Sequence, residues 1–212
     1  QAGISLDLDL TDLRGPVLQG ERGLSVKGPE VGNASYYYSQ TRIQAQGMLT
    51  VEGQEYAVQG LAWKDHEFST SALSPSLVGW DWFSLQLDDG SELMLYDLRR
   101  EDGSIDDYSS AMLVRADGST RALARQDFSI TPTGSWRSPH SGAEYPSGWR
   151  VAVPAEDLAL EVTPYILDQE LNVSFIYWEG AVRVQGAHAG QTVRGNGYVE
   201  LTGYESSMQG RL

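Results

Sequence analysis

The chain has 212 residues and a formal net charge of −14, and 41% of its residues are hydrophobic and 10% aromatic. That length supports one large domain or two small ones, and the aromatic content excludes a disordered chain. An acidic chain without basic clusters disfavours nucleic acid and anionic membranes as partners. The absence of Cys excludes disulfides, thiolate catalysis and thiolate metal sites.

The first third of the chain predicts strands interrupted by one long loop. Apolar and polar residues alternate over 4–10, whereas 14–33 is rich in Gly and Pro and reads as a loop. One or two strands are expected over 34–51 and another over 55–68, after a turn at 52–54. About four strands are too few for a closed barrel.

The rest of the chain predicts a meander of short strands. Residues 69–77 resemble a linker, and hairpins follow at 78–99 and 109–125. Residues 165–171 allow at most one helical turn. Further strands are expected at 126–131, 147–153, 158–163, 171–178, 180–185 and 196–203. About twelve strands without an amphipathic helix predict an all-β barrel or sandwich.

The first hairpin places a carboxylate on an apolar face. A two-residue turn at Asp89-Gly90 sets Leu85 opposite Met94, Phe83 opposite Tyr96 and Asp81 opposite Leu98. Burial would raise the pKa of Asp81, as in an active-site acid. Alternatively, Asp81 is a structural residue that accepts backbone hydrogen bonds. Two tryptophans, Trp80 and Trp82, are expected on the other face.

Ionisable and aromatic residues alternate at the end of the strand over 55–68. One face is expected to carry Trp63, Asp65 and Glu67, and the other Lys64, His66 and Phe68. His66 could be a general acid–base with a pKa near neutrality. It could equally be a hydrogen-bonded residue at a domain junction.

Two aromatic groups offer further candidates. Tyr36 and Tyr38 share a strand face, which suits either a stacking platform or an ordinary β core. Glu179 could be an acid or a sugar ligand, or a turn residue beside Trp178, which would plug a barrel end.

No cofactor or metal is expected. A three-histidine zinc site would need His66, His140 and His188, and the last two lie in loops rich in Gly and Ser. The chain also lacks a G-x-S-x-G motif and a phosphate-binding Gly loop before a helix.

Several long segments resemble the lipocalin-like family of carotenoid 1,2-hydratases and AttH-type proteins, often described as secreted hydrolases. These are KGPEVGNASYYYSQTRIQAQGMLTVEGQEYAVQGLAWKDHEFSTSAL, GWDWFSLQLDDGSELMLYDLRREDGS, YPSGWRVAVP, YWEGAVRVQG and GNGYVELTGY. The resemblance implies two lipocalin-like β-barrels in tandem. Residues 1–70 would form the second half of the first barrel, 71–77 a linker and 78–212 the second barrel. The first barrel would then need a missing N-terminal segment, from a separate chain or a second copy.

The resemblance also implies site residues. His66 matches the acid–base His of the hydratases, and Phe68 replaces the Trp that follows two residues later. Tyr96 matches the Tyr on a later strand. At the position of the family's Asp, this chain has Asp97 next to Tyr96, and Leu98 holds the same-face position.

These observations favour an exported bacterial enzyme, periplasmic or secreted after removal of its signal. The leading expectation is a glycosidase-like hydrolase of a small sugar conjugate or hydrophobic molecule, with an aromatic-lined site near the barrel junction. Alternatives are a hydratase of an isoprenoid or carotenoid alkene, a carrier of a hydrophobic ligand, and an accessory protein of an export system. The expected catalytic residues are Asp65, His66, Glu67, Asp81 and Tyr96. The expected substrate-binding residues are Trp63, Phe68, Trp80, Trp82, Tyr36, Tyr38, Asp97 and Trp178.

Overall fold

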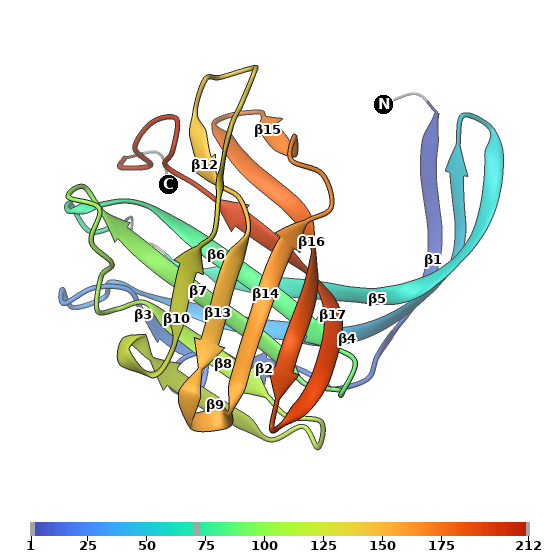
Figure 1. Ribbon diagram of the computed structural model, residues 1–212, viewed down its shortest axis with the longest axis horizontal. Coiled ribbons are helices and arrows are strands. Elements are labelled where there is room, and N and C mark those ends of the chain that lie inside the picture. The colour runs from blue at the N-terminus through green and yellow to red at the C-terminus, as the bar shows by residue number, and fades with distance from the viewer. Residues whose placement is uncertain (1–2, 70–72, 211–212) are drawn as a thin grey trace.

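The computed structural model describes residues 3–69 and 73–210, and its fold is all-β, as predicted. Two large antiparallel sheets divide the chain (Figure 1). The first sheet holds β1 (Ile4–Asp12), β2 (Val17–Leu18), β3 (Leu24–Val26), β4 (Ala34–Val51) and β5 (Gln54–Phe68).

The 18-residue strand β4 organises the first sheet. It pairs with β1, β2, β3 and β5, and its pairing with β5 shifts between Gln40 and Ile43. The segment 14–33, expected to be a loop, therefore contributes two short strands that dock on β4. The end of this sheet at the N-terminus extends away from the second sheet (Figure 1). Its exposed apolar side chains include Ile4, Leu6, Leu10, Met48 and Tyr56.

The second sheet has ten strands in the order β10-β13-β14-β16-β17-β6-β7-β8-β9, with β15 paired to β16. Their bounds are β6 (Leu77–Leu87), β7 (Glu92–Arg100), β8 (Ser110–Val114), β9 (Thr120–Ala124), β10 (Ser129–Pro132), β13 (Trp149–Val153), β14 (Leu158–Pro164), β15 (Glu170–Asn172), β16 (Ile176–His188) and β17 (Gln191–Leu201). The strands β11 (Ser135–Arg137) and β12 (Glu144–Pro146) form a separate pair. The sheet curls around a large apolar cluster that includes Phe83, Leu95 and Trp149.

The outer face of β6, β7 and β8 packs against the first sheet. Tyr37 and Val17 from the first sheet join Met94, Tyr96 and Leu98 from the second in one apolar cluster. A buried carboxylate reinforces the junction: Glu92 forms ion pairs with Arg14, at 3.2 Å, and with Arg42, and its side chain is 0% exposed.

The pairing of β6 with β7 corrects the predicted hairpin by one residue. Asp81 lies opposite Asp97, Trp82 opposite Tyr96, and Leu85 opposite Leu93. The connection is longer than a two-residue turn, because Leu87 donates its N–H to the Ser91 carbonyl at 2.9 Å. Gly90 has a φ of +86°, which suits a three-residue loop that ends in a left-handed residue.

The Gly180 region also differs from the prediction. Residues 176–188 form the single strand β16, and Glu179 lies within it instead of in a turn. A Cβ on Gly180 would lie 2.1 Å from the Trp178 ring, so this Gly permits close packing. Among the described residues, helix is limited to single 3-10 turns at Arg125–Asp127 and Pro154–Glu156, and no helix there is suited to crossing a membrane.

Candidate functional site

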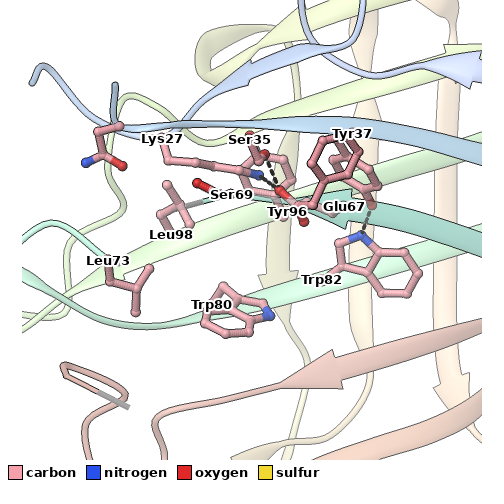
Figure 2. Close-up of a pocket in the computed structure, with 12 residues that line it drawn as sticks. Lys27, Ser35, Tyr37, Glu67, Ser69, Leu73, Trp80, Trp82, Tyr96 and Leu98 are labelled. Atoms are coloured by element: carbon pink, nitrogen blue, oxygen red, sulfur yellow. Dashed lines mark hydrogen bonds and ion pairs between the residues drawn. The ribbon is translucent and has the colours of Figure 1, made fainter. Parts of the chain in front are cut away.

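A cavity of about 420 Å³ lies where the end of β5 faces the outer surface of β6 and β7. We call it the first cavity. Figure 2 shows its side chains coming from both sheets. It is lined by Lys27, Asn33, Ser35, Tyr37, Glu67, Phe68, Ser69, Leu73, Trp80, Trp82, Tyr96 and Leu98.

An ion pair forms the polar wall of the first cavity. Lys27 Nζ lies 3.1 Å from Glu67 Oε1, and the Ser35 hydroxyl donates a hydrogen bond to the same oxygen (Figure 2). Both contacts use Oε1, so the second carboxylate oxygen of Glu67 takes part in neither. The Glu67 side chain is 39% exposed, which leaves its carboxylate accessible from the cavity.

Aromatic rings hold Lys27 in place. Its Nζ lies 4.0 Å from the centroid of the Tyr96 ring and 5.5 Å from that of Tyr37. Burial lowers the pKa of Lys27, but Tyr96 and Glu67 outweigh it and raise the pKa above its ordinary value. The residue therefore presents a persistent positive charge beside the Glu67 carboxylate.

Two tryptophans form much of the opposite wall. Trp80 and Trp82 come from β6, and the Trp82 indole N–H donates to the Tyr37 hydroxyl at 3.0 Å (Figure 2). Trp80 Nε1 donates to Glu200, whose pKa burial raises to about 7. Burial and the nearby carboxylates raise the pKa of Tyr37 well above its ordinary value.

A second cavity of about 410 Å³ lies beside the first, nearer the start of β5. It is lined by Leu61, Trp63, Asp65, Trp82, Ser84, Gln86, Asn196, Gly197 and Tyr198. Asp65 accepts hydrogen bonds from Ser39 and, at 3.1 Å, from Trp63 Nε1. The buried Gln19 side chain donates to Ser39 Oγ at 2.9 Å and so supports this arrangement. Burial by the surrounding protein raises the pKa of Asp65.

The predicted alternation over 63–68 is present, and it separates His66 from both cavities. The His66 ring stacks on Tyr38 with centroids 5.2 Å apart and meets the edge of Phe68 at 5.4 Å. Tyr36, also expected to bind substrate, is exposed on this face, 5.5 Å from the Phe68 ring. Tyr36, Tyr38 and His66 line neither cavity, whereas Phe68 contributes to the rim of the first.

Asp81 and Asp97 lie in the interior of the second sheet instead of at the cavities. Asp81 pairs with Arg99 at 2.8 Å and accepts hydrogen bonds from Tyr204. Asp97 faces Arg125 at 3.6 Å, and burial raises its pKa to about 6. Strand alternation points both carboxylates inward, so neither Asp81, predicted to be catalytic, nor Asp97, predicted to bind substrate, lines either cavity.

Trp178 is likewise a core residue. It is 2% exposed, packs against Trp149 and donates its indole N–H to the Leu167 carbonyl at 2.7 Å. Trp178, predicted to bind substrate, thus lies in the core of the second sheet and lines neither cavity.

Sequence reasoning missed seven residues that line the first cavity, among them Lys27, Ser35 and Tyr37. Lys27 lies in a segment expected to be a loop, and nothing local connects it to Glu67, 40 positions later. Ser35 and Tyr37 alternate with the tyrosines that were proposed, so the strand pattern contained them on its other face. Over residues 3–69 and 73–210, no group of three or more His, Asp or Glu side chains is arranged to hold a metal ion.

Comparisons with known proteins agree with this architecture. The crystal structure of a putative AttH from Nitrosomonas europaea matches with a TM-score of 0.87 and 40% sequence identity, over 96% of this chain and 63% of that one. Kievitone hydratase from Nectria haematococca matches with a TM-score of 0.77 and 20% identity, over 97% of this chain and 63% of that one. CghA matches with a TM-score of 0.53 and 16% identity, over 97% and 62% of the two chains.

These last two likenesses concern the fold alone. The chain spans less than two thirds of the length of each of these three structures. No curated protein matches the sequence. The model of the AttH-like family matches residues 1–204, and the chain therefore belongs to the AttH-like family.

Proposed function

We propose that the protein is an acid–base enzyme of the hydratase type, which adds water to a double bond of a hydrophobic small molecule bound in the first cavity. The observation that carries this proposal is the Lys27–Glu67 pair, at 3.1 Å, on the wall of a cavity lined by Trp80 and Trp82. Such a cavity excludes water around an apolar ligand while it keeps one charged pair in reach.

The two charges suit the two halves of water addition to a double bond that is conjugated with a carbonyl. The Glu67 carboxylate takes a proton from water, and the water oxygen bonds to the far carbon of the double bond. The bonding electrons move onto the carbonyl oxygen, where Lys27 stabilises the negative charge. Glu67 then returns its proton to the neighbouring carbon, so the product differs from the substrate by one water.

The arrangement supports hydration better than glycoside hydrolysis. Glycosidases place two carboxyl groups on either side of one bond. Here Glu67 and Asp65 project from the same face of β5, so both carboxylates lie on one side of a bound ligand instead of flanking a bond. The name of the kievitone hydratase, which shares the fold, is consistent with the hydratase reading.

Mass spectrometry of incubations with a panel of hydrophobic enones, alkenes and glycosides tests the proposal. The expected result is a product heavier by one water from an enone. Glu67→Gln should lower kcat by about 10²–10⁴-fold, the range for loss of a general acid–base group. Glu55→Gln is the matched control, because Glu55 lies on the same strand and is exposed.

Other outcomes contradict the proposal. Cleavage of a glycoside into two products would establish a hydrolase. Recovery of an unchanged bound molecule, without turnover of any compound, would establish a carrier. Equal turnover by wild type and Glu67→Gln would place the chemistry elsewhere.

A further inference from the structure

One side chain, Trp82, forms a wall of both cavities. We propose that the two cavities are one binding site for an elongated amphiphilic molecule, whose apolar body lies in the first cavity and whose hydroxylated end lies in the second. Trp82 is then the residue that determines how far a ligand reaches. This inference rests on the proposed function and specifies the substrate class of the same site.

The cavities follow each other along one strand. Glu67 and Asp65 are two residues apart on the same face of β5, a separation of about 7 Å at the usual rise of a strand. A molecule of ordinary ligand size that contacts Glu67 at one end can therefore reach Asp65, provided that it passes Trp82.

The contacts of Trp82 suit a side chain that separates the two cavities and can rotate to join them. Its ring is half-buried and meets the edge of Trp63 with centroids 6.5 Å apart. Its indole N–H makes the hydrogen bond to the Tyr37 hydroxyl, which comes from the other sheet. A rotation of this side chain would break that hydrogen bond and would connect the two cavities.

The linings differ in chemistry from one end to the other. Beyond the charged pair, the first cavity offers Leu73, Trp80 and Leu98, which suit an apolar body. The second cavity offers the Asp65 carboxylate and the Asn196 amide, which can bind hydroxyl groups. The hydrogen bonds from Ser39 and Trp63 to Asp65 use Oδ1, and the Tyr37 hydroxyl also interacts with this carboxylate. The bond from Tyr165 to Asn196 uses Oδ1, so Asn196 Nδ2 takes no part in it.

Calorimetric binding of matched probes tests the inference: an n-alkyl glucoside and the n-alkanol of the same chain length. The measurements use Glu67→Gln protein, so that turnover does not contribute. We expect the glucoside to bind at least about tenfold more tightly, because its hydroxyl groups gain hydrogen bonds in the second cavity. Asp65→Asn combined with Asn196→Ala should remove most of the glucoside's advantage over the alkanol, because the glucoside has many more hydroxyl groups to lose contacts with these side chains.

The role of Trp82 has its own measurement. In Trp82→Ala, the alkanol that binds most tightly should have a longer chain than in wild type, because the joined cavities accept it. Trp136→Ala should show no such change, because Trp136 lines neither cavity. If Trp82→Ala does not fold, Tyr37→Phe keeps the ring and removes the hydroxyl that accepts from Trp82 and also interacts with Asp65 and Ser39, and a smaller shift in the same direction is expected.

Two results would overturn the inference. One is equal affinity for the two probes, or binding of neither, in protein that is folded by circular dichroism. The other is an alkanol length dependence that is identical in wild type, Trp82→Ala and Tyr37→Phe. Neither result bears on Glu67-dependent water addition, which is measured separately by product mass.

Discussion

Two ion pairs of similar geometry lie in contrasting places. Lys27 and Glu67 are 3.1 Å apart at the wall of the first cavity, and Arg99 and Asp81 are 2.8 Å apart inside the second sheet. Asp81 also accepts hydrogen bonds from Tyr204, at 3.0 and 2.9 Å to its two oxygens. Both oxygens of Asp81 therefore accept hydrogen bonds from protein groups, whereas Lys27 and Ser35 both contact Oε1 of Glu67 and not Oε2.

This difference shows why a perturbed pKa alone does not locate an active site. Burial raises the pKa of Asp81 and, to about 6, that of Asp97, yet neither lines the two cavities. Structural ion pairs shift pKa values as strongly as catalytic groups do. What distinguishes Glu67 is access to a ligand-sized space.

The largest expected effect is on catalysis at the cavity pair. Lys27→Met should lower kcat by about 10²–10³-fold, because the developing oxyanion loses its stabilising charge. The steady-state rate of enone hydration measures this. Lys64→Met is the matched control, because Lys64 is exposed on the opposite face of β5 from Glu67. This variant should retain the wild-type kcat. A wild-type rate in Lys27→Met would make the cavity pair structural, like the interior one.

The interior pair should respond in stability instead of kcat. Asp81→Ala should lower the free energy of unfolding by about 3–5 kcal/mol, because Arg99 is left buried without its partner. Urea denaturation measures the loss, and kcat of the remaining folded fraction should match wild type. A change in kcat comparable to that of Lys27→Met would remove the distinction between the two pairs.

The second interior carboxylate, Asp97, should make the stability of the protein depend on pH. Its folded pKa of about 6 lies above the value of 3.8 for an unperturbed Asp, so its contribution to stability is present at low pH and lost as pH rises through 6. Asp97→Asn, which imitates the protonated carboxyl, should therefore be more stable than wild type at pH 8 by up to about 3 kcal/mol. At about pH 4 the two proteins should be alike. Denaturation curves at both pH values check this, and an equal difference at both would exclude Asp97 titration as the cause.

The smallest effect is expected at the second cavity. Ser39→Ala removes a hydrogen bond to the Asp65 carboxylate and should raise the pKa of Asp65 further, at a cost of about 1 kcal/mol in stability. Carboxyl chemical shifts followed against pH measure the change, with Ser5→Ala on exposed β1 as the control. An unchanged titration of Asp65 would show that the buried serine does not tune it.

The strand pattern predicted much of the fold and part of the site. Alternation over 63–68 correctly separated Asp65 and Glu67 from His66, because side-chain direction in a strand depends only on position. The same logic failed at the hairpin of β6 and β7. One extra loop residue, fixed by Gly90 and Ser91, moved the register and placed Asp81 opposite Asp97.

The remaining site residues depend on contacts between distant segments. Lys27 reaches Glu67 because β3 docks on the start of β4, and Leu24 pairs there with Tyr36. Such docking is strand pairing between distant segments of one sheet, which periodicity within one segment does not encode. Alternation also defines two faces of β4, but it does not say that the face with Tyr37, and not the one with Tyr36, meets the second sheet.

The strand β1 has a consequence for the behaviour of the protein in solution. Among the described strands it pairs with β4 alone, so its other edge presents unpaired backbone groups beside the exposed Leu6 and Leu10. Asp7 and Asp9 alternate with these leucines and are exposed. Charges on an edge strand repel a second copy that would add to it, and salt screens that repulsion. Self-association of the protein should therefore increase with ionic strength. Buffer of low salt concentration should best prevent the β1 edges of two copies from pairing.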